Sequence, residues 1–181
     1  MLDFLFRRGN PTNTWQRSPE LILTVALDVP SLNGVSLGSQ LDQLSSLGRD
    51  DEFQFDTYCY LDLGLGIECA KDGTLNGFTI VLIEEDGEFE PYRGELSWNG
   101  ESLNTGNLTR DDLTAVCGDW YWLDSDDEES IAFYEFANYE MQVELSLSAA
   151  VKRFVLTKDR VLADPKQRDS YQVNKPWPPD Y

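Results

Sequence analysis

The fold that the sequence predicts is decided by two stretches of similar design, Ser39-Gln-Leu-Asp-Gln-Leu-Ser-Ser-Leu-Gly48 and Thr109-Arg-Asp-Asp-Leu-Thr-Ala-Val-Cys-Gly118. Each begins with a hydroxyl residue that has an aspartate three positions later, as in a capping box, and each ends at a glycine. Two short helices are therefore predicted, from about 39 to 47 and between Thr109 and Gly118. Apolar residues with the spacing of one helix face are Leu41, Leu44 and Leu47 in the first, and Leu113, Val116 and Cys117 in the second.

Three β-strands are predicted after each helix, from runs of apolar and β-branched residues between turn signals. The last two strands of the first group are joined by Asp72-Gly73, a strong signal for a tight hairpin. Two further strands precede the helices. The predicted strands are 20–28, 53–61, 64–71, 75–84, about 92–98, 130–136, 139–147 and 151–158.

Matching positions in the two parts of the chain indicate an internal repeat. Leu32-Asn33-Gly34 matches Trp98-Asn99-Gly100 at an offset of 66 residues, and the limits of the two helices match at an offset of 70. We interpret this as two tandem units of one helix and three antiparallel strands, at about 31–84 and 98–158. Coincidence is the alternative, because Asn-Gly turns and glycines at helix ends are common.

The predicted fold class is α+β, an antiparallel sheet with short helices on one face. One unit alone is too small to bury a core, whereas two units joined edge to edge make a longer sheet. The second face of that sheet then stays open to solvent or to a partner. We expect a single domain over 19–158, an N-terminal arm over 1–18, and a C-terminal helical turn with a Pro-rich tail over 159–181.

The predicted unit resembles that of a known family. A turn that contains glycine, a short helix that ends at Leu47-Gly48 or Cys117-Gly118, and three antiparallel strands are similar to the unit of the beta-lactamase inhibitor protein and of small outer-membrane lipoproteins that share its fold. The resemblance is one of pattern and covers about residues 31–158. It implies an open sheet face and connecting loops that bind another protein, with acidic and aromatic side chains as anchors.

The C-terminal residues are expected to pack on the domain. Asp164 is a suitable cap and Pro165 a suitable first residue for one or two helical turns. The tail Asn174-Lys-Pro-Trp-Pro-Pro-Asp-Tyr181 favours extended structure, and its Trp177 is costly to leave exposed. The alternative is a free tail that acts as a recognition motif, which would make the chain a structural or adaptor domain.

Charge is distributed unevenly along the chain, whose formal net charge is −19. Residues 19–150 hold 28 Asp and Glu against four Lys and Arg, whereas residues 1–18 and 151–181 are mildly basic. Such a surplus repels nucleic acid and anionic lipid and attracts basic protein surfaces. We therefore expect a basic protein surface as the partner, and neither nucleic acid nor a membrane.

The composition argues against most enzyme classes. The sequence has no histidine, so the commonest general base and metal ligand is missing. Gly64-Leu-Gly66 lacks the third glycine and the lysine of a phosphate-binding loop. A hydrolase that uses two carboxylates is a less favoured alternative, because 33 acidic residues offer many pairs and mark none of them. We expect a protein that is not an enzyme.

No metal and no cofactor is predicted. Asp124, Asp126 and Glu128 are clustered carboxylates of the kind that calcium prefers, but they lack the central glycine and the distal glutamate of a twelve-residue calcium loop. Zinc is disfavoured because there is neither histidine nor a Cys-x-x-Cys pair. The three cysteines are expected to be reduced core thiols, with a disulfide between Cys59 and Cys69 as the alternative.

The candidate partner-binding site is the densest acidic run together with the aromatic residues before it. Carboxylates steer a basic partner, and Trp and Tyr bury rigid area with few rotamers to lose. The alternative is a solvated loop tip beside core aromatics, which also suits the further acidic runs at 50–52 and 84–90. The candidate residues are Trp120, Tyr121, Trp122, Asp124, Asp126, Asp127, Glu128 and Glu129.

The start of the chain, Met1-Leu-Asp-Phe-Leu-Phe-Arg-Arg8, does not predict a secretory signal, because it has an early acidic residue and only three consecutive apolar ones. No apolar run approaches the roughly 20 residues that cross a bilayer as a helix. We therefore expect a cytosolic protein-binding module, most concretely an inhibitor or immunity-type protein against a basic target.

Overall fold

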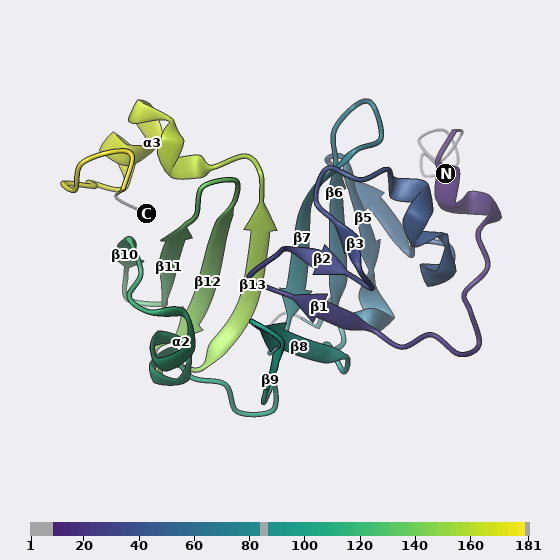
Figure 1. The fold of residues 1–181 in the computed structure, drawn as a ribbon, viewed down its shortest axis with the longest axis horizontal. Coiled ribbons are helices and arrows are strands. Elements are labelled where there is room, and N and C mark those ends of the chain that lie inside the picture. Colours follow the sequence, from purple (N-terminus) through teal and green to yellow (C-terminus); the bar gives the residue numbers. More distant parts are fainter. Residues whose placement is uncertain (1–8, 84–86, 180–181) are drawn as a thin grey trace.

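The computed structural model describes residues 9–83 and 87–179, which form two β-sheets (Figure 1). The larger sheet is antiparallel throughout and has the strand order β10-β11-β12-β13-β7-β6-β5-β4. Its strands are β4 (Glu52–Gln54), β5 (Thr57–Tyr60), β6 (Leu65–Cys69), β7 (Leu75–Val81), β10 (Trp122–Ser125), β11 (Glu129–Glu135), β12 (Glu140–Ser146) and β13 (Val151–Thr157).

The smaller sheet has the order β3-β2-β1-β8-β9, in which β1 and β8 are parallel neighbours. The α+β class is confirmed, but the expectation of a single sheet is wrong. The predicted strands 20–28 and 92–98 pair with each other, which buries Val25 and Leu96 in the core instead of extending the larger sheet. The strands are β1 (Thr24–Ala26), β2 (Ser31–Leu32), β3 (Val35–Ser36), β8 (Glu95–Trp98) and β9 (Glu101–Leu103).

The helices of the described residues are short. In α2 the predicted capping box is confirmed, because the Thr109 side chain accepts from the Asp112 amide while the Asp112 carboxylate accepts from the Thr109 amide at 2.9 Å. The box predicted at Ser39 is wrong: η2 begins after Gln40, which has no side-chain cap bond. The helices are the 3₁₀-helices η1 (Pro11–Thr14), η2 (Leu41–Leu47), η3 (Leu61–Leu63) and η4 (Val161–Ala163), and the α-helices α2 (Arg110–Cys117) and α3 (Pro165–Ser170).

The core lies between the smaller sheet and one face of the larger sheet, the core face. Paired residues make apolar rows across this face, such as Met141, Leu156, Phe78 and Ile67 in adjacent strands, all of them buried. The predicted leucines of η2 are buried in the same cluster, and so is Leu113 of α2. Val116 is 37% exposed, so its predicted place on the buried face of α2 is wrong.

The larger sheet consists of two halves that meet at β7 and β13 (Figure 1). The first half is η2 followed by β4–β7, and the second half is α2 followed by β10–β13. Each half thus has four strands where three were predicted. The predicted strand 53–61 is divided by a turn at Phe55-Asp56, and β10 was not predicted. A common origin of the two halves stays a prediction.

The two halves, and the turns of the smaller sheet that precede them in the chain, nevertheless resemble each other in geometry. The Asn-Gly turn of β2–β3 has φ angles of 51° and 77°, and that of β8–β9 has 50° and 77°. At the junction, Phe78 pairs with Leu156 and Ile80 with Phe154. These two pairs exchange when the halves are exchanged at the offset of 76 residues that separates the two phenylalanines. The sheet therefore has an approximate two-fold relation about its centre.

The chain outside the two sheets packs on opposite ends of the molecule. Asn10 Nδ2 donates to Asp50 Oδ1 at 2.9 Å, and Arg17 Nε donates to the Leu47 carbonyl at 3.1 Å, so residues 9–18 lie against the first half. In the second half, α3 begins as predicted, with Asp164 as cap and Pro165 as its first residue. Residues 1–8 of the predicted arm, 84–86 of the acidic run at 84–90, and 180–181 of the tail lie outside the described residues.

Candidate protein-binding surface

The acidic run of the candidate site is the tip of the β10–β11 hairpin. Trp122 pairs with Phe133, and Ser125 pairs with Ser130, so residues 126–129 make the turn. The Asp126 carboxylate accepts from the amides of Glu128 at 2.8 Å and Glu129 at 2.9 Å, and these bonds lower the pKa of Asp126. The carboxylate closes the turn with its own backbone, as turn aspartates commonly do.

The acidic residues of the hairpin differ in what they contact. Asp126, Asp127 and Glu128 are exposed at the tip. Asp124 is half-buried on β10, and Glu129 accepts from Lys152 Nζ at 2.9 Å. Among the described residues, no basic side chain lies within ion-pair distance of the three tip carboxylates. The tip is therefore a local concentration of uncompensated negative charge, and we call residues 126–128 the acidic tip.

The aromatic residues of the candidate site do not join the acidic tip. Trp120 packs against the core, with the Arg110 guanidinium 5.8 Å from the centre of its ring. Tyr121 donates its hydroxyl to the Pro176 carbonyl at 2.9 Å, and its ring meets the Trp177 ring edge-on at 5.8 Å. Trp122 is half-buried on β10. The expected single surface of carboxylates and aromatic rings is therefore divided into an exposed acidic part and an aromatic part engaged within the fold.

The face of the larger sheet opposite the core, the outer face, is partly covered in the second half by residues 159–179, the C-terminal segment. The ring of Tyr171 lies 5.1 Å from that of Phe133, which is fully buried although it points away from the core. Arg160 stands over the Trp177 ring at 4.6 Å. The predicted open face is therefore closed around Phe133, while Gln142 and Val155 of the same face stay half-buried.

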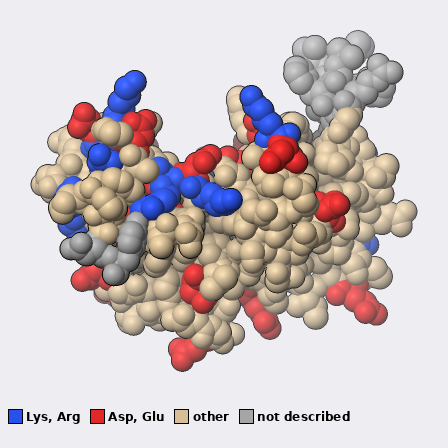
Figure 2. All heavy atoms as spheres, turned by 45° about the horizontal axis from the view of Figure 1, so that its top comes forward, with Lys and Arg blue, Asp and Glu red and all other residues tan. Residues whose placement is uncertain are grey.

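Basic side chains lie along the C-terminal segment. Figure 2 shows Lys and Arg side chains gathered beside the hollow of the molecule, while Asp and Glu side chains are scattered over the visible surface. The basic residues of the segment and its approach are Lys158, Arg160, Lys166, Arg168 and Lys175. Several of them form hydrogen bonds or ion pairs with other residues of the protein. For example, Arg168 Nη1 donates to the Leu162 carbonyl at 2.8 Å.

The outer face of the first half has a different composition. Thr79, Gly66 and Cys59 are paired neighbours on β7, β6 and β5, and the threonine and cysteine side chains are half-buried. In the same half, Phe55 at the β4–β5 turn is 94% exposed and has a φ of 49°. Sequence reasoning missed this residue. The available signal was a Phe-Asp pair between two short runs of alternating residues.

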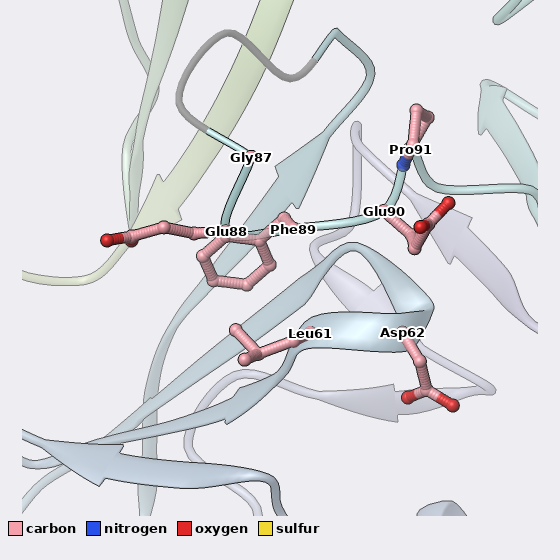
Figure 3. Close-up of a pocket in the computed structure, with 7 residues that line it drawn as sticks. All are labelled: Leu61, Asp62, Gly87, Glu88, Phe89, Glu90 and Pro91. Atoms are coloured by element: carbon pink, nitrogen blue, oxygen red, sulfur yellow. The ribbon is translucent and has the colours of Figure 1, made fainter.

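An open groove of about 480 Å³ lies between η3 and residues 87–91. Figure 3 shows that the Leu61 and Phe89 side chains lie on facing sides of it, while the carboxylates of Asp62 and Glu88 point away. Asp62 instead accepts from Arg17 Nη2 at 3.0 Å, and this contact lowers the pKa of Asp62. The side chains that face each other across the groove are thus apolar, although Asp62, Glu88 and Glu90 also line it, and Glu90 pairs with Arg93 at 3.6 Å.

The cysteines are free thiols. Burial raises the pKa of Cys59 to about 11 and those of Cys69 and Cys117 to about 12. Within residues 9–83 and 87–179, no three Asp, Glu or Cys side chains are grouped so as to hold a metal ion. No helix in the same part of the chain has the length and apolar character needed to span a membrane.

The fold has a counterpart among solved structures. The crystal structure of a DUF4309 family protein (YjgB) from Bacillus subtilis subsp. subtilis str. 168 is similar to this chain with a TM-score of 0.50 and 14% sequence identity, over 72% of this chain and 87% of that one. At this identity the likeness concerns the fold alone. No protein-family model and no curated protein matches the chain. The resemblance to the beta-lactamase inhibitor protein stays a prediction.

Proposed function

We propose that the chain is a non-enzymatic, cytosolic protein-binding module whose partner presents a basic surface, with an inhibitor or immunity-type role as its most concrete form. The observation that carries this proposal is the acidic tip. Its three carboxylates are exposed, lie in one turn, and have no basic neighbour among the described residues.

The distribution of ion pairs supports the choice of this surface. Basic residues of β13 and the C-terminal segment pair with other acids of the second half: Lys152 with Glu129, and Arg160 with Glu135, both at 2.9 Å. Carboxylates that are already paired contribute little to long-range attraction. The tip carboxylates act at distances up to a Debye length, about 8 Å at physiological salt, and would mainly raise the rate of association.

The divided site assigns separate parts to the candidate residues. Asp126, Asp127 and Glu128 make the contact, while Trp120, Tyr121 and Trp122 hold the hairpin on the domain. Asp126 also has a structural part, because its carboxylate closes the turn. Substitutions that test binding are therefore best made at Asp127 and Glu128.

The test compares two double variants of equal net charge. Asp127→Lys with Glu128→Lys reverses the acidic tip, and Glu95→Lys with Glu101→Lys reverses two exposed residues of the smaller sheet. Binding of lysozyme, as a basic protein probe, is measured by stopped-flow kinetics at low and physiological salt. We expect the tip variant to lose about tenfold in association rate at low salt and much of its salt dependence, and the control to lose less than about threefold.

Equal losses of association rate in the two variants would show that only the net charge matters. The acidic tip would then be excluded as the binding site. Unchanged thermal unfolding of both variants is the control for folding, and it is expected because all four side chains are exposed.

A further inference from the structure

Two acidic residues that the candidate site does not include are buried side by side beneath the C-terminal segment. Glu135 on β11 and Glu140 on β12 are directly paired across the two strands, so both side chains lie on the outer face. The Glu135 side chain and the whole of Glu140 are fully buried. Like charges directly opposite each other destabilise a sheet, and burial makes the repulsion worse.

The donors that reach this pair come largely from the C-terminal segment. Arg160 Nε donates to Glu135 Oε2 at 2.9 Å, and the Leu162 amide donates to Glu140 Oε2 at 3.2 Å. Glu140 Oε1 accepts from Gln142 Nε2 at 2.7 Å. Glu135 Oε1 is buried and has no hydrogen-bond donor among the described residues. The buried Glu135 Oε1 therefore lacks a hydrogen-bond donor.

The charges around the pair do not balance if both carboxyls are ionised. Among residues 9–83 and 87–179, one guanidinium of the segment that packs on Glu135 and Glu140 lies within ion-pair distance, that of Arg160. Arg168 of α3 stands further along, over the Trp177 ring at 5.5 Å, and Tyr121 before β10 is neutral, since burial raises its pKa. A proton on Glu135 Oε1, donated to Glu140, satisfies the orphaned oxygen and removes the surplus charge.

We propose that Glu135 and Glu140 form a proton-binding site that fastens the C-terminal segment to the outer face, and that loss of this proton releases the segment. The site binds one proton between two carboxyls and uses it to hold Arg160 and the Leu162 amide in place. Release of the segment would remove Tyr171 from Phe133 and expose the Phe133 ring to solvent.

The direction of the pH dependence follows from the raised pKa. Burial, followed by the contact with Glu140, raises the pKa of Glu135 to about 8 in the docked state. When the segment is released, the Glu135 carboxyl on β11 becomes solvated and its pKa falls towards the ordinary value of about 4.3. Docking is therefore strongest at low pH and weakens as pH rises between those two values, by about tenfold in the docking constant for each pH unit. Above pH 8 no further loss is expected.

Hydrogen exchange on the full chain tests this proposal. Exchange is measured between pH 6 and 9 and corrected for the intrinsic rate of each amide, with the Leu162 amide and the amides of α3 as reporters. In the wild-type protein we expect protection of these amides to fall at least tenfold between pH 6 and 8, while that of β7 and β13 stays constant. A change of less than about twofold overturns the proposal.

A matched pair of variants identifies the group responsible. Glu135→Gln keeps the size of the side chain and offers a permanent donor to Glu140, so the segment should stay protected at every pH. Glu144→Gln removes a carboxyl from the same face of β12, where it pairs with Arg153 at 3.5 Å, and should keep the wild-type pH dependence. A Glu135→Gln protein that retains the wild-type pH dependence also overturns the proposal.

A second measurement does not depend on the folding of any variant. Infrared difference spectra of the wild-type protein between pH 6 and 9 should show the loss of one protonated carboxyl band as the segment loses protection. Absence of that band excludes the shared proton. None of these outcomes involves the acidic tip, so the proposed partner binding and the proton site can fail independently.

Discussion

The first half of the larger sheet presents small residues on its outer face, among them Gly66, Cys59 and Thr79, whereas the second half presents Phe133 and the buried pair of glutamates. The halves nevertheless share a helix followed by four strands, and each is preceded in the chain by an Asn-Gly turn of the same geometry. The same backbone plan therefore supports two unlike surfaces. The difference indicates that the C-terminal segment, which packs on one half only, determines which residues the outer face of each half can present.

The chain after β13 explains why the second half differs. Residues 151–181 hold seven of the 14 basic residues, and they bring the partners for Glu129, Glu135 and Glu144. A fully buried Phe133 contributes about 1.5–3 kcal/mol relative to an exposed one, which the first half cannot gain without a cover of its own. The second half thus gains stability by closing part of its outer face, and the acidic tip stays exposed.

The largest expected effect tests whether the halves are equivalent at their junction. Phe78→Ala and Phe154→Ala each remove a fully buried ring from the central strands of the core face. Because the two residues exchange places in the two-fold relation, each should destabilise the protein by a similar amount, about 3–5 kcal/mol. Urea unfolding measures the free energy of both variants. A loss below about 1.5 kcal/mol in one of them would break the equivalence of the halves.

A smaller effect separates the halves at the ends of their helices. Gly48 and Gly118 end η2 and α2 with φ angles of 83° and 82°, a region that favours glycine. A Cβ at Gly48 would lie 2.7 Å from the Arg17 backbone nitrogen, whereas a Cβ at Gly118 would meet no atom within 4 Å. Gly118→Ala should therefore cost only the backbone strain, about 1–3 kcal/mol. Gly48→Ala should cost more, because residues 9–18 must move.

Hydrogen exchange distinguishes the two causes. In Gly48→Ala the amides of residues 9–18 should lose protection, since the contact of Asn10 with Asp50 depends on the position of this segment. In Gly118→Ala the protection of the same amides should stay as in the wild-type protein. Equal stability losses with no change in residues 9–18 would show that the close approach at Arg17 relaxes without cost.

The helices show what the sequence could predict and what it could not. Every signal for α2 lies within ten residues, from Thr109 to Gly118, so local reasoning found its cap and its end. The sequence pattern that begins at Ser39 is similar, yet the Ser39 backbone pairs with a distant strand instead of starting a helix. The Ser39 carbonyl accepts from the Leu75 amide at 2.8 Å, and Gln40 forms an isolated bridge with Thr74. A partner more than thirty residues away moved the helix start, and no local pattern indicates it.

The candidate site was predictable to the same extent. The acidic run was expected at a loop tip as the alternative to a contact patch, and its residues 126–128 are exposed in a turn. The place of the aromatic residues depends on contacts with Trp177 and Pro176, the latter 55 residues from Tyr121. The paired glutamates had no signal at all, because Glu135 and Glu140 meet only through the register of β11 and β12.

The smallest effect concerns two tryptophans with different surroundings. Trp122 Nε1, on the outer face of the second half, is buried and has no acceptor among the described residues. Trp98 is 8% exposed and packs in the core, 5.6 Å from the Phe136 ring. Trp98→Phe should cost about 1 kcal/mol of stability, because it removes buried apolar area. Trp122 is half-buried, so Trp122→Phe removes less buried apolar area, and it also removes an unsatisfied donor whose burial costs about 1–3 kcal/mol. This variant should therefore be neutral or stabilising. Urea unfolding of both variants measures the difference in sign. Equal losses would show that the Trp122 indole has an acceptor in solution, and the outer face of the second half would then be wetter than its cover by the C-terminal segment implies.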